Sequence, residues 1–274
     1  MPRSGQTFVA RPLAGLPREA EMVAMRDIIP AATLTVALAG ARGGGEAQLV
    51  TILPDLERAW RRADGVPVVA LQPPRGSDDV SRDLGNALEA ALAAEPGAPA
   101  WPAAYGSDGP RLQELVDLDA PATFELAANM DFWRALDPER KDIAEAAERF
   151  EEGLIPTEQI AGLDGAFWTQ MGTRDYLRWS LGVEEDALLD ALARLQAERK
   201  AGLVEGSKYV GAFRVLGLVI PVWDLPPGTA AADLAQPLAA FKALLDAALA
   251  QTAPLDASQR RARAGLVARS LTLR

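Results

Sequence analysis

The sequence predicts an α+β fold in which mostly antiparallel sheets pack against helices. Short β-branched runs occur in both halves of the chain, and the longest of them is Val210–Gly228. Neighbouring runs are close enough in sequence to pair as hairpins. Alanine- and leucine-rich segments with helical spacing separate the groups of strands, and apolar residues make up 49% of the chain. This content is sufficient for a large buried core.

The first half, residues 1–98, is expected to form a β-β-β-α unit behind an extended arm. Its predicted elements are a helix over Glu19–Ile29, strands over Thr33–Ala39, Ala47–Leu53 and Val66–Leu71, and helices over Asp55–Ala63 and Asp78–Glu95. Apolar side chains at helical spacing define the last helix, which Ser77 or Asp78 can cap. Pro67 places the third strand at the edge of its sheet or marks the start of that strand.

The second half, residues 99–274, adjoins a segment rich in proline, glycine and alanine (96–110), which is typical of a linker. This half is expected to be α+β with a helical insertion and a basic tail. Strands are predicted over Ala122–Ala128 and Tyr176–Leu181, and helices over Arg111–Val116, Asp131–Ala135, Pro138–Glu152, Thr157–Met171, Glu184–Lys200, Pro237–Gln251 and Ser258–Val267. Pro237 fits the first turn of its helix, where a missing N–H has no partner to lose.

The run Val210–Gly228 predicts the central hairpin of the second half. Its strands, Tyr209–Val215 and Leu218–Asp224, can pair through a tight turn at Leu216-Gly217. The order of strand, Pro-Pro, glycine and helix seen there also occurs after Val66–Gly76. The chain therefore either contains two β-β-β-α units, with a helical insertion in the second, or repeats a common turn.

The chain contains no cysteine and no histidine. Disulfides, thiolate metal sites, cysteine nucleophiles, histidine general bases and imidazole metal ligands are therefore excluded. Any catalysis would depend on carboxylates, lysine, tyrosine, serine, threonine or a bound cofactor, and any metal site would be an all-oxygen site for magnesium or calcium. Because no motif indicates such a site, we expect no cofactor, no metal and no assignable catalytic residue.

The net charge of −10 is unevenly distributed. Residues 1–18 carry three arginines and residues 260–274 carry five, with no acid in either segment, which leaves −18 for residues 19–259. An acidic body repels nucleic acid, so we expect no nucleic-acid partner for it. The basic tail with Arg260, Arg261 and Arg263 can bind an acidic partner or fold back onto the acidic body, and the second interpretation is favoured.

No segment is long and apolar enough to form a membrane span or the core of a signal peptide. We therefore expect a cytoplasmic protein without a membrane partner.

The glycine-rich segment Gly40–Gly45 is a weak candidate for a phosphate loop. A strand pattern follows it, and no lysine with serine or threonine opens a helix there. A flexible hairpin loop is the favoured interpretation.

Four other residues are the candidates for ligand binding, namely Arg178, Arg214, Trp223 and Asp224. Asp224 ends the hairpin before Pro226, where a carboxylate most often caps the following turn. Tryptophans such as Trp223 more often anchor cores and interfaces than bind ligands.

Segments along nearly the whole chain resemble an uncharacterised actinobacterial family that is classed only as a domain of unknown function. They are residues 13–33, 80–92, 109–117, 154–162, 176–195, 211–229 and 260–274, and include VSRDLGNALEAAL, YLRWSLGVEEDALLDALARL and GAFRVLGLVIPVWDLPPGT. The resemblance implies that the arginine tail belongs to the domain. Many relatives in this family carry an N-terminal zinc motif similar to the one that ends the SecA translocation motor, and such motifs contact proteins or ribosomes. This chain has no cysteine and therefore lacks that module.

Three hypotheses about function follow. The first is a non-catalytic protein-interaction module linked to translation or protein handling, with a protein partner. The second is a carboxylate- or magnesium-dependent hydrolase or transferase, and the third is a structural homodimer, since unpaired strand edges and six tryptophans offer interface material.

Overall fold

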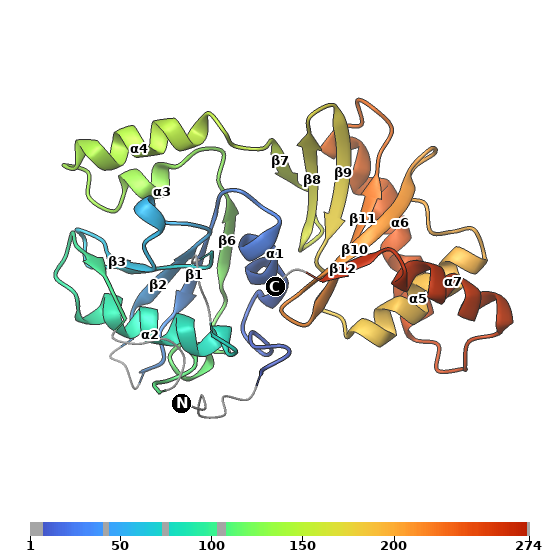
Figure 1. The fold of residues 1–274 in the computed structure, drawn as a ribbon, viewed down its shortest axis with the longest axis horizontal. Coiled ribbons are helices and arrows are strands. Elements are labelled where there is room, and N and C mark those ends of the chain that lie inside the picture. Colours follow the sequence, from blue (N-terminus) through green and yellow to red (C-terminus); the bar gives the residue numbers. More distant parts are fainter. Residues whose placement is uncertain (1–7, 41–43, 73–76, 103–107, 273–274) are drawn as a thin grey trace, which may run out of the picture. The chain divides into compact units, whose positions relative to one another are not determined.

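The computed structural model describes residues 8–40, 44–72, 77–102 and 108–272. The chain divides into two compact units, Met1–Leu154 and Ile155–Arg274 (Figure 1). In the described residues, each unit has one sheet of six strands. Antiparallel pairs dominate both sheets and helices pack against them, which confirms the predicted α+β class. Parts of the glycine-rich segment 40–45, of the turn at 72–77 and of the segment 96–110 lie outside the described residues.

The first sheet has the order β5-β3-β4-β2-β1-β6. Its strands are β1 (Ala32–Ala37), β2 (Glu46–Val50), β3 (Ala59–Arg61), β4 (Pro67–Ala70), β5 (Pro99–Ala100) and β6 (Thr123–Leu126). Only β2 and β4 among these neighbours run parallel. Because β4 lies inside the sheet, Pro67 marks the start of a strand and not an edge.

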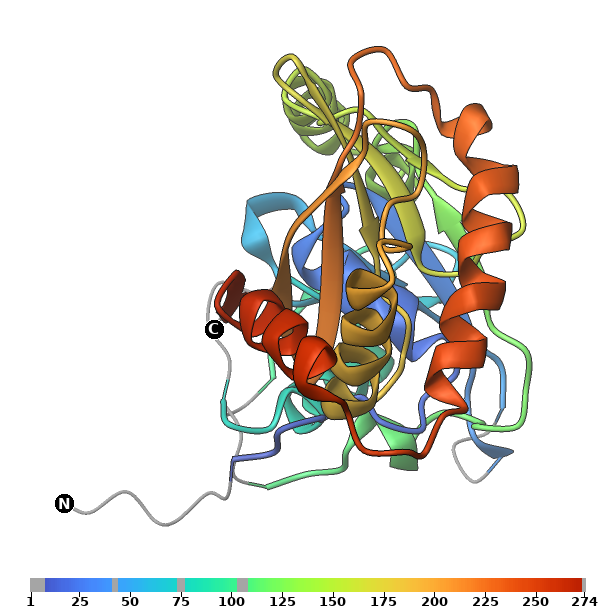
Figure 2. The same cartoon turned by 90° about the vertical axis from the view of Figure 1, so that its right-hand side faces the viewer.

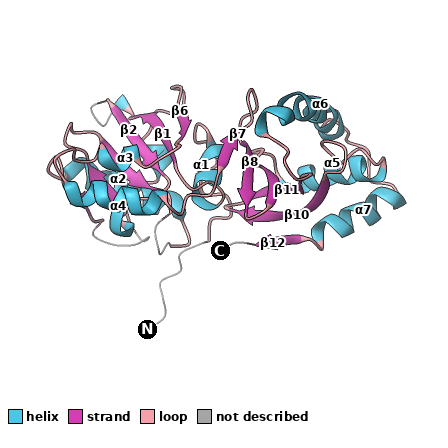
Figure 3. Cartoon of the chain, turned by 90° about the horizontal axis from the view of Figure 1, so that it is seen from above, coloured by secondary structure: helices cyan, strands magenta, loops and turns pink. Residues whose placement is uncertain are grey.

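Helices cover both faces of the first sheet. They are α1 (Glu19–Asp27), α2 (Val80–Ala93), α3 (Asp131–Arg134) and α4 (Lys141–Glu151), with short 3₁₀ turns η2 (Pro54–Leu56) and η3 (Leu112–Glu114). On one face, Trp133 of α3 and Ile143 of α4 pack in a core cluster with Val68 of β4. Because side chains alternate along a strand, Val69 points to the other face, where α2 lies against β3 and β4 (Figure 1). Figure 3 colours the helices and strands of the chain by class.

Three expectations for the first unit were wrong. The predicted helix over Asp55–Ala63 is instead η2 followed by strand β3, because Asp55 has φ 54° and Leu56 has φ 59°, a left-handed backbone that no right-handed helix can continue. The cap of α2 is Asp79, whose carboxylate accepts from the Arg82 amide, and not Ser77 or Asp78. Residues 8–16 are not an extended arm but a series of turns that bury Leu13.

The segment 99–154 belongs to the first unit, which differs from the boundary expected between residues 98 and 99. Strand β5 pairs with β3, and β6 pairs with β1. Strands β5 and β6 are the two edges of the first sheet, so the proline- and glycine-rich segment 96–110 contains an edge strand of that sheet.

The second sheet has the order β12-β10-β11-β9-β8-β7. Its strands are β7 (Thr157–Gln159), β8 (Ala166–Met171), β9 (Arg174–Trp179), β10 (Lys208–Val215), β11 (Leu218–Asp224) and β12 (Ser270–Thr272). The predicted central hairpin is confirmed as β10 and β11. Its turn residues Leu216 and Gly217 have φ values of 47° and 82°, as a tight two-residue hairpin turn requires.

The helices of the second unit lie on one face of its sheet (Figure 2). They are α5 (Glu185–Ala197), α6 (Ala231–Leu249) and α7 (Ala257–Val267). Leu192 of α5 and Leu238 and Phe241 of α6 pack in one core cluster with Trp179 and Trp223 of the sheet. Helix α7 lies along α5. The run Val210–Gly228 therefore supplies core strands, as its apolar pattern indicates.

Three further expectations, in the second unit, were wrong. The predicted helix over Thr157–Met171 is the hairpin of β7 and β8, because Gly162 and Gly165 adopt positive φ values of 75° and 70° between the strands. Helix α6 starts at Ala231, so Pro237 lies inside it and not in its first turn. The carboxylate that holds the turn after β11 is Asp175, which accepts from the Gly228 amide at 2.8 Å, and not Asp224.

The two strands of the suggested repeat differ in their neighbours. Strand β4 lies between a parallel and an antiparallel strand, whereas β11 lies between two antiparallel strands. Among the described residues, no helix combines the length and the hydropathy needed to cross a bilayer.

Candidate binding site

A recess opens on the face of the second sheet opposite α5 and α6. Its volume is about 280 Å³. It is lined by Met171, Tyr176 and Arg178 of the β8–β9 hairpin, by Val210, Gly211, Ala212 and Phe213 of β10, by Val222 of β11 and by Arg269, which follows α7. Two arginines and several apolar residues therefore line one small recess.

Strand pairing places Arg178 in this recess. Along β9, Leu177 and Trp179 belong to the core beneath the helices, so Tyr176 and Arg178 point to the opposite face. Arg178 pairs in register with Val222 of β11, which in turn pairs with Gly211 of β10. The floor of the recess is thus built from three adjacent strands, which hold the guanidinium against an apolar surface.

An irregularity in β10 opens one side of the recess. The register of β10 against β11 shifts between Tyr209 and Gly211, so Val210 is left without a partner and is 42% exposed. Gly211 allows the chain to approach Arg269, because a Cβ atom at this position would collide with the carbonyl oxygen of Arg269. The missing side chain therefore brings the second arginine beside the strand.

Arg269 is held by the backbone and by an aromatic ring. Its Nε donates to the Gly265 carbonyl at 3.0 Å and its Nη1 donates to the Tyr209 carbonyl at 3.2 Å. Its guanidinium carbon lies 5.4 Å from the centroid of the Tyr209 ring, within the range of a cation–π contact. These contacts fix the position of the charge without neutralising it.

Burial lowers the pKa of Arg178, and the interaction with Tyr176 opposes this effect. In such a partly buried environment, charge-assisted hydrogen bonds of a guanidinium are stronger than in bulk water. Tyr176 and Asp224 raise the pKa of Arg174, and the 3.9 Å ion pair with Asp224 largely balances the charge of this arginine.

The size and lining of the recess indicate what it can accept. Pockets for drug-sized ligands and cofactors span roughly 300–1,000 Å³, so this recess accommodates one side chain or a small anionic group. Its lining includes two arginines and no acidic residue. Guanidinium groups bind carboxylates and phosphates through paired hydrogen bonds. The arrangement thus suits an anionic group attached to an apolar one.

Only one of the four candidate binding residues lies in the recess, namely Arg178. Arg214 of β10 donates to Glu185 of α5 at 2.7 Å, on the helical face of the sheet. Trp223 is fully buried, and its indole donates to the Ala201 carbonyl at 2.8 Å. Asp224 lies at the end of β11 beside Arg174. The structure thus does not bring these four residues together.

Sequence reasoning missed most of the recess, above all Arg269. One signal was present in β9, where the alternating pattern already places Arg178 with Tyr176 away from the core. The bulge at Val210 and the approach of Arg269 have no such signal, because both depend on how the end of α7 meets β10.

The basic tail lines a second, more open groove along α5 and α7, with a volume of about 890 Å³. Arg260 and Arg263 line it, but so do Asp186 and Asp190. Arg263 bonds both acids, each at 2.6 Å, which supports the fold-back interpretation for this residue. Because acids and arginines pair with each other in this groove, it is a weaker candidate for an external anion.

Replacing Arg263 with glutamine is expected to reduce the free energy of unfolding by less than about 1 kcal/mol, since Asp186 is well exposed and such surface ion pairs contribute little. Urea denaturation at low and at high salt measures this. The difference from the wild type should shrink as salt screens the pair. A loss of several kcal/mol would contradict a surface role for Arg263.

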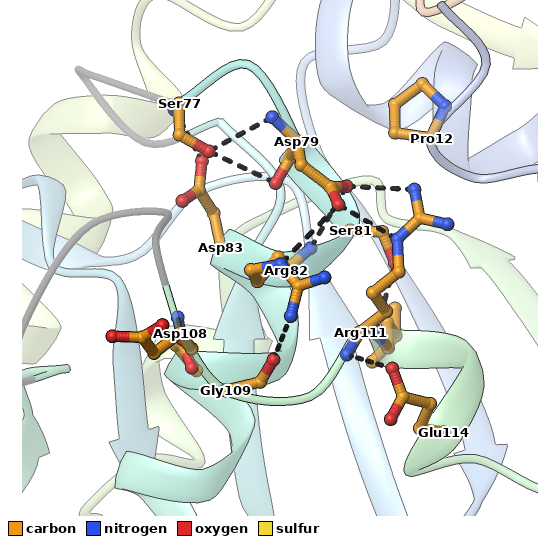
Figure 4. Close-up of polar contacts among 12 residues, drawn as sticks. Pro12, Ser77, Asp79, Ser81, Arg82, Asp83, Asp108, Gly109, Arg111 and Glu114 are labelled. Atoms are coloured by element: carbon orange, nitrogen blue, oxygen red, sulfur yellow. Dashed lines mark hydrogen bonds and ion pairs between the residues drawn. The ribbon is translucent and has the colours of Figure 1, made fainter. Parts of the chain in front are cut away.

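A dense polar cluster at the start of α2 is a third candidate (Figure 4). Arg111 donates to both carboxylate oxygens of Asp79, at 2.9 and 3.0 Å. Ser81 accepts from the Leu112 amide at 3.0 Å, and Asp83 accepts from the Ser77 amide at 2.6 Å. These bonds attach the segment before η3 to α2. The cluster therefore stabilises the fold at this point, and most of its polar atoms already have partners within the chain.

Within the described ranges, no three acidic side chains meet in an arrangement that could hold a metal ion.

Comparison with known proteins gives one match. The model of a family of unknown function (DUF5926) matches residues 12–274. No curated protein and no solved structure matches the chain. The family model spans both units and the recess, and it assigns no reaction to either unit.

Proposed function

The chain belongs to the family of unknown function DUF5926, and we propose from its own geometry that it is a non-catalytic protein-interaction module. Its second unit binds an acidic segment of a partner protein. One acidic side chain of that segment enters the recess between Arg178 and Arg269, and a neighbouring apolar side chain covers Val210 and Met171.

The observation that carries this proposal is a pair of arginines in an apolar recess without an acidic lining residue. Charge-assisted hydrogen bonds from guanidinium groups are among the strongest polar contacts in proteins. Val210 and Met171 are 42% and 43% exposed, so they offer apolar contact area at the rim. A partner that presents both kinds of group gains more there than a free anion does.

The distribution of charge between the units supports the same partner class. Residues 1–154 contain 25 acidic and 15 basic residues, whereas residues 155–274 contain 13 of each. The net charge of −10 therefore resides entirely in the first unit. The second unit is neutral as a whole and does not repel an acidic segment at long range. The resemblance to the uncharacterised family directs the search for that partner to translation and protein handling.

The test is a binding titration of the full chain with short fluorescent peptides. The acidic peptide alternates glutamate and leucine, and a control peptide has lysine in place of every glutamate. Arg178→Gln and Arg269→Gln are each expected to weaken binding of the acidic peptide on the order of ten-fold, because each removes a charge-assisted hydrogen bond. Arg214→Gln makes the same change of charge on the opposite face and should leave the affinity within about two-fold.

Equal weakening by all three substitutions would mean that only net charge matters, and the proposal would fail. It would also fail if inorganic phosphate bound as tightly as the peptide, or if the acidic peptide did not bind. If the recess instead forms a homodimer interface, sedimentation experiments should show a wild-type dimer that Arg178→Gln dissociates. In that case the partner would be a second copy of this chain and not a different protein.

A further inference from the structure

A second surface with a different chemical character lies at the β5 edge of the first sheet. It consists of Asp55, Leu56 and Glu57, which lead into β3, and of Trp101, which follows β5. We call it the Leu56–Trp101 surface. Leu56 is 50% exposed and Trp101 is 65% exposed. Large apolar side chains with this exposure are costly to leave in water, and tryptophan is among the residues most enriched at binding hot spots.

Strand pairing brings the two segments together. Ala59 of β3 pairs with Ala100 of β5, so the residues before β3 and after β5 are neighbours. The Trp101 side chain lies close enough to the Glu57 carboxylate to lower its pKa. Trp101 and Glu57 are therefore neighbours, and the surface is not a single isolated side chain.

The backbone that presents Leu56 is unusual. Asp55 and Leu56 both adopt left-handed φ values, 54° and 59°, which side chains bulkier than asparagine or aspartate rarely do. The turn is closed by the Leu56 amide, which donates to Leu53, and by the Glu57 amide, which donates to Pro54. Leu53 and Pro54 are buried, so a fixed base supports the turn while Leu56 points outward. Strained residues held this way are common at binding surfaces.

Two carboxylates, those of Asp55 and Glu57, belong to this surface. Partial burial raises the pKa of Glu57, the side chain of Trp101 lowers it, and the nearby Asp55 raises it. A cation placed near Glu57 would favour its charged form and so offset the effects of burial and of Asp55, which both raise its pKa. The whole first unit carries the net charge of −10, which attracts cations to this unit at long range.

The same unit already contains a contact between a guanidinium group and an indole ring, at Arg140. Its guanidinium carbon lies 6.0 Å from the centroid of the Trp60 ring, and Asp142, Asp137 and Asp55 interact with its charge. Indole ring, carboxylates and guanidinium together form a stable arrangement. Trp101 and Glu57 repeat the pairing of an indole ring with a carboxylate, here on the surface.

We propose that the Leu56–Trp101 surface binds a basic segment of a partner protein, with a lysine or arginine stacked on Trp101 beside Glu57 and an aliphatic side chain packed on Leu56. This interaction does not depend on the recess in the second unit. The two surfaces select partner segments of opposite charge, so one chain can connect an acidic segment to a basic one.

The test is a titration of the full chain with a fluorescent peptide that alternates arginine and leucine. Trp101→Ala is expected to weaken binding on the order of ten-fold, since it removes both the stacking surface and the anchor. Glu57→Gln is expected to weaken binding about three- to ten-fold, because it removes the charge and keeps the shape. Two matched controls in the same unit are Leu118→Ala, at an exposed leucine, and Glu145→Gln, at an exposed glutamate. Both should leave the affinity within about two-fold.

Each remaining outcome would overturn the proposal. The first is no binding of the basic peptide, and the second is equal weakening by Glu57→Gln and Glu145→Gln, which indicates a nonspecific charge effect. The third is a wild-type dimer in sedimentation experiments that Trp101→Ala converts to a monomer, because the surface would then bind a second copy. Arg178→Gln should not change the affinity for the basic peptide. The proposal for the Leu56–Trp101 surface can therefore fail independently of the proposal for the recess.

Discussion

Trp223→Ala is expected to lower the free energy of unfolding of the second unit by about 3–5 kcal/mol, the range for large aromatic residues removed from a core. Trp223 is fully buried near the end of β11, the second strand of the predicted hairpin. Its ring makes edge contacts with Tyr209 and Phe241, at centroid distances of 5.8 and 5.6 Å. The substitution also leaves the Ala201 carbonyl without its donor. The cavity and the lost hydrogen bond both lower the free energy of unfolding.

Trp101→Ala is the matched control, because it removes the same side chain from a site that is 65% exposed. Its expected effect on the free energy of unfolding is within about 0.5 kcal/mol, as for other surface positions. Urea denaturation followed by circular dichroism measures both variants, and the transition of each unit should be fitted separately. If Trp223→Ala lost less than about 1 kcal/mol, the assignment of this hairpin to the core would be wrong.

Gly85→Ala is expected to destabilise the first unit by about 1–3 kcal/mol or more. Gly85 lies in α2, where a Cβ atom would collide with the backbone carbonyl of Pro110 and crowd Arg111. The collision is with backbone, which the network around Asp79 and Arg111 holds in place. The helix and the segment before η3 would have to separate, and the bonds shown in Figure 4 would be strained.

Gly265→Ala provides a control with the opposite sign. Gly265 lies in α7, and a Cβ atom there has no neighbour within 4 Å. Alanine stabilises a helix by about 0.5–1 kcal/mol relative to glycine, so this variant should be slightly more stable than the wild type. Thermal or urea unfolding that ranked Gly85→Ala as equal to Gly265→Ala would contradict the close packing of α2 against Pro110.

The sequence predicts those elements well whose pattern is local. The helices around Leu88 and Leu192 have regular apolar spacing, and the hairpin of β10 and β11 has β-branched runs joined by a glycine turn. The errors occur where long-range pairing overrides local spacing. Trp60 lies four residues from Leu56, which suggests a helix, but its strand is completed by pairing with Val68 and Pro99.

The candidate sites were harder to predict because they combine residues from distant parts of the chain. Arg178 could be placed by alternation in one strand, but Arg269 reaches the recess only because Gly211 lets the end of α7 come close. In the same way, Trp101 becomes a candidate binding residue only because the pairing of β3 with β5 places it beside Glu57. A tryptophan inside a proline- and glycine-rich segment was the available signal for that surface.

The most direct test of the interaction at the recess is nuclear magnetic resonance of the arginine side chains. The full chain is labelled with nitrogen-15 arginine, and the Nε–Hε signals are followed during titration with the glutamate–leucine peptide. The Nε–Hε signals of Arg178 and Arg269 should shift together in a saturable manner, while that of Arg214 on the opposite face should not move. If the signals of Arg178 and Arg269 remained unchanged at saturating peptide, or if only those of Arg260, Arg261 and Arg263 shifted, the recess would not be the binding site.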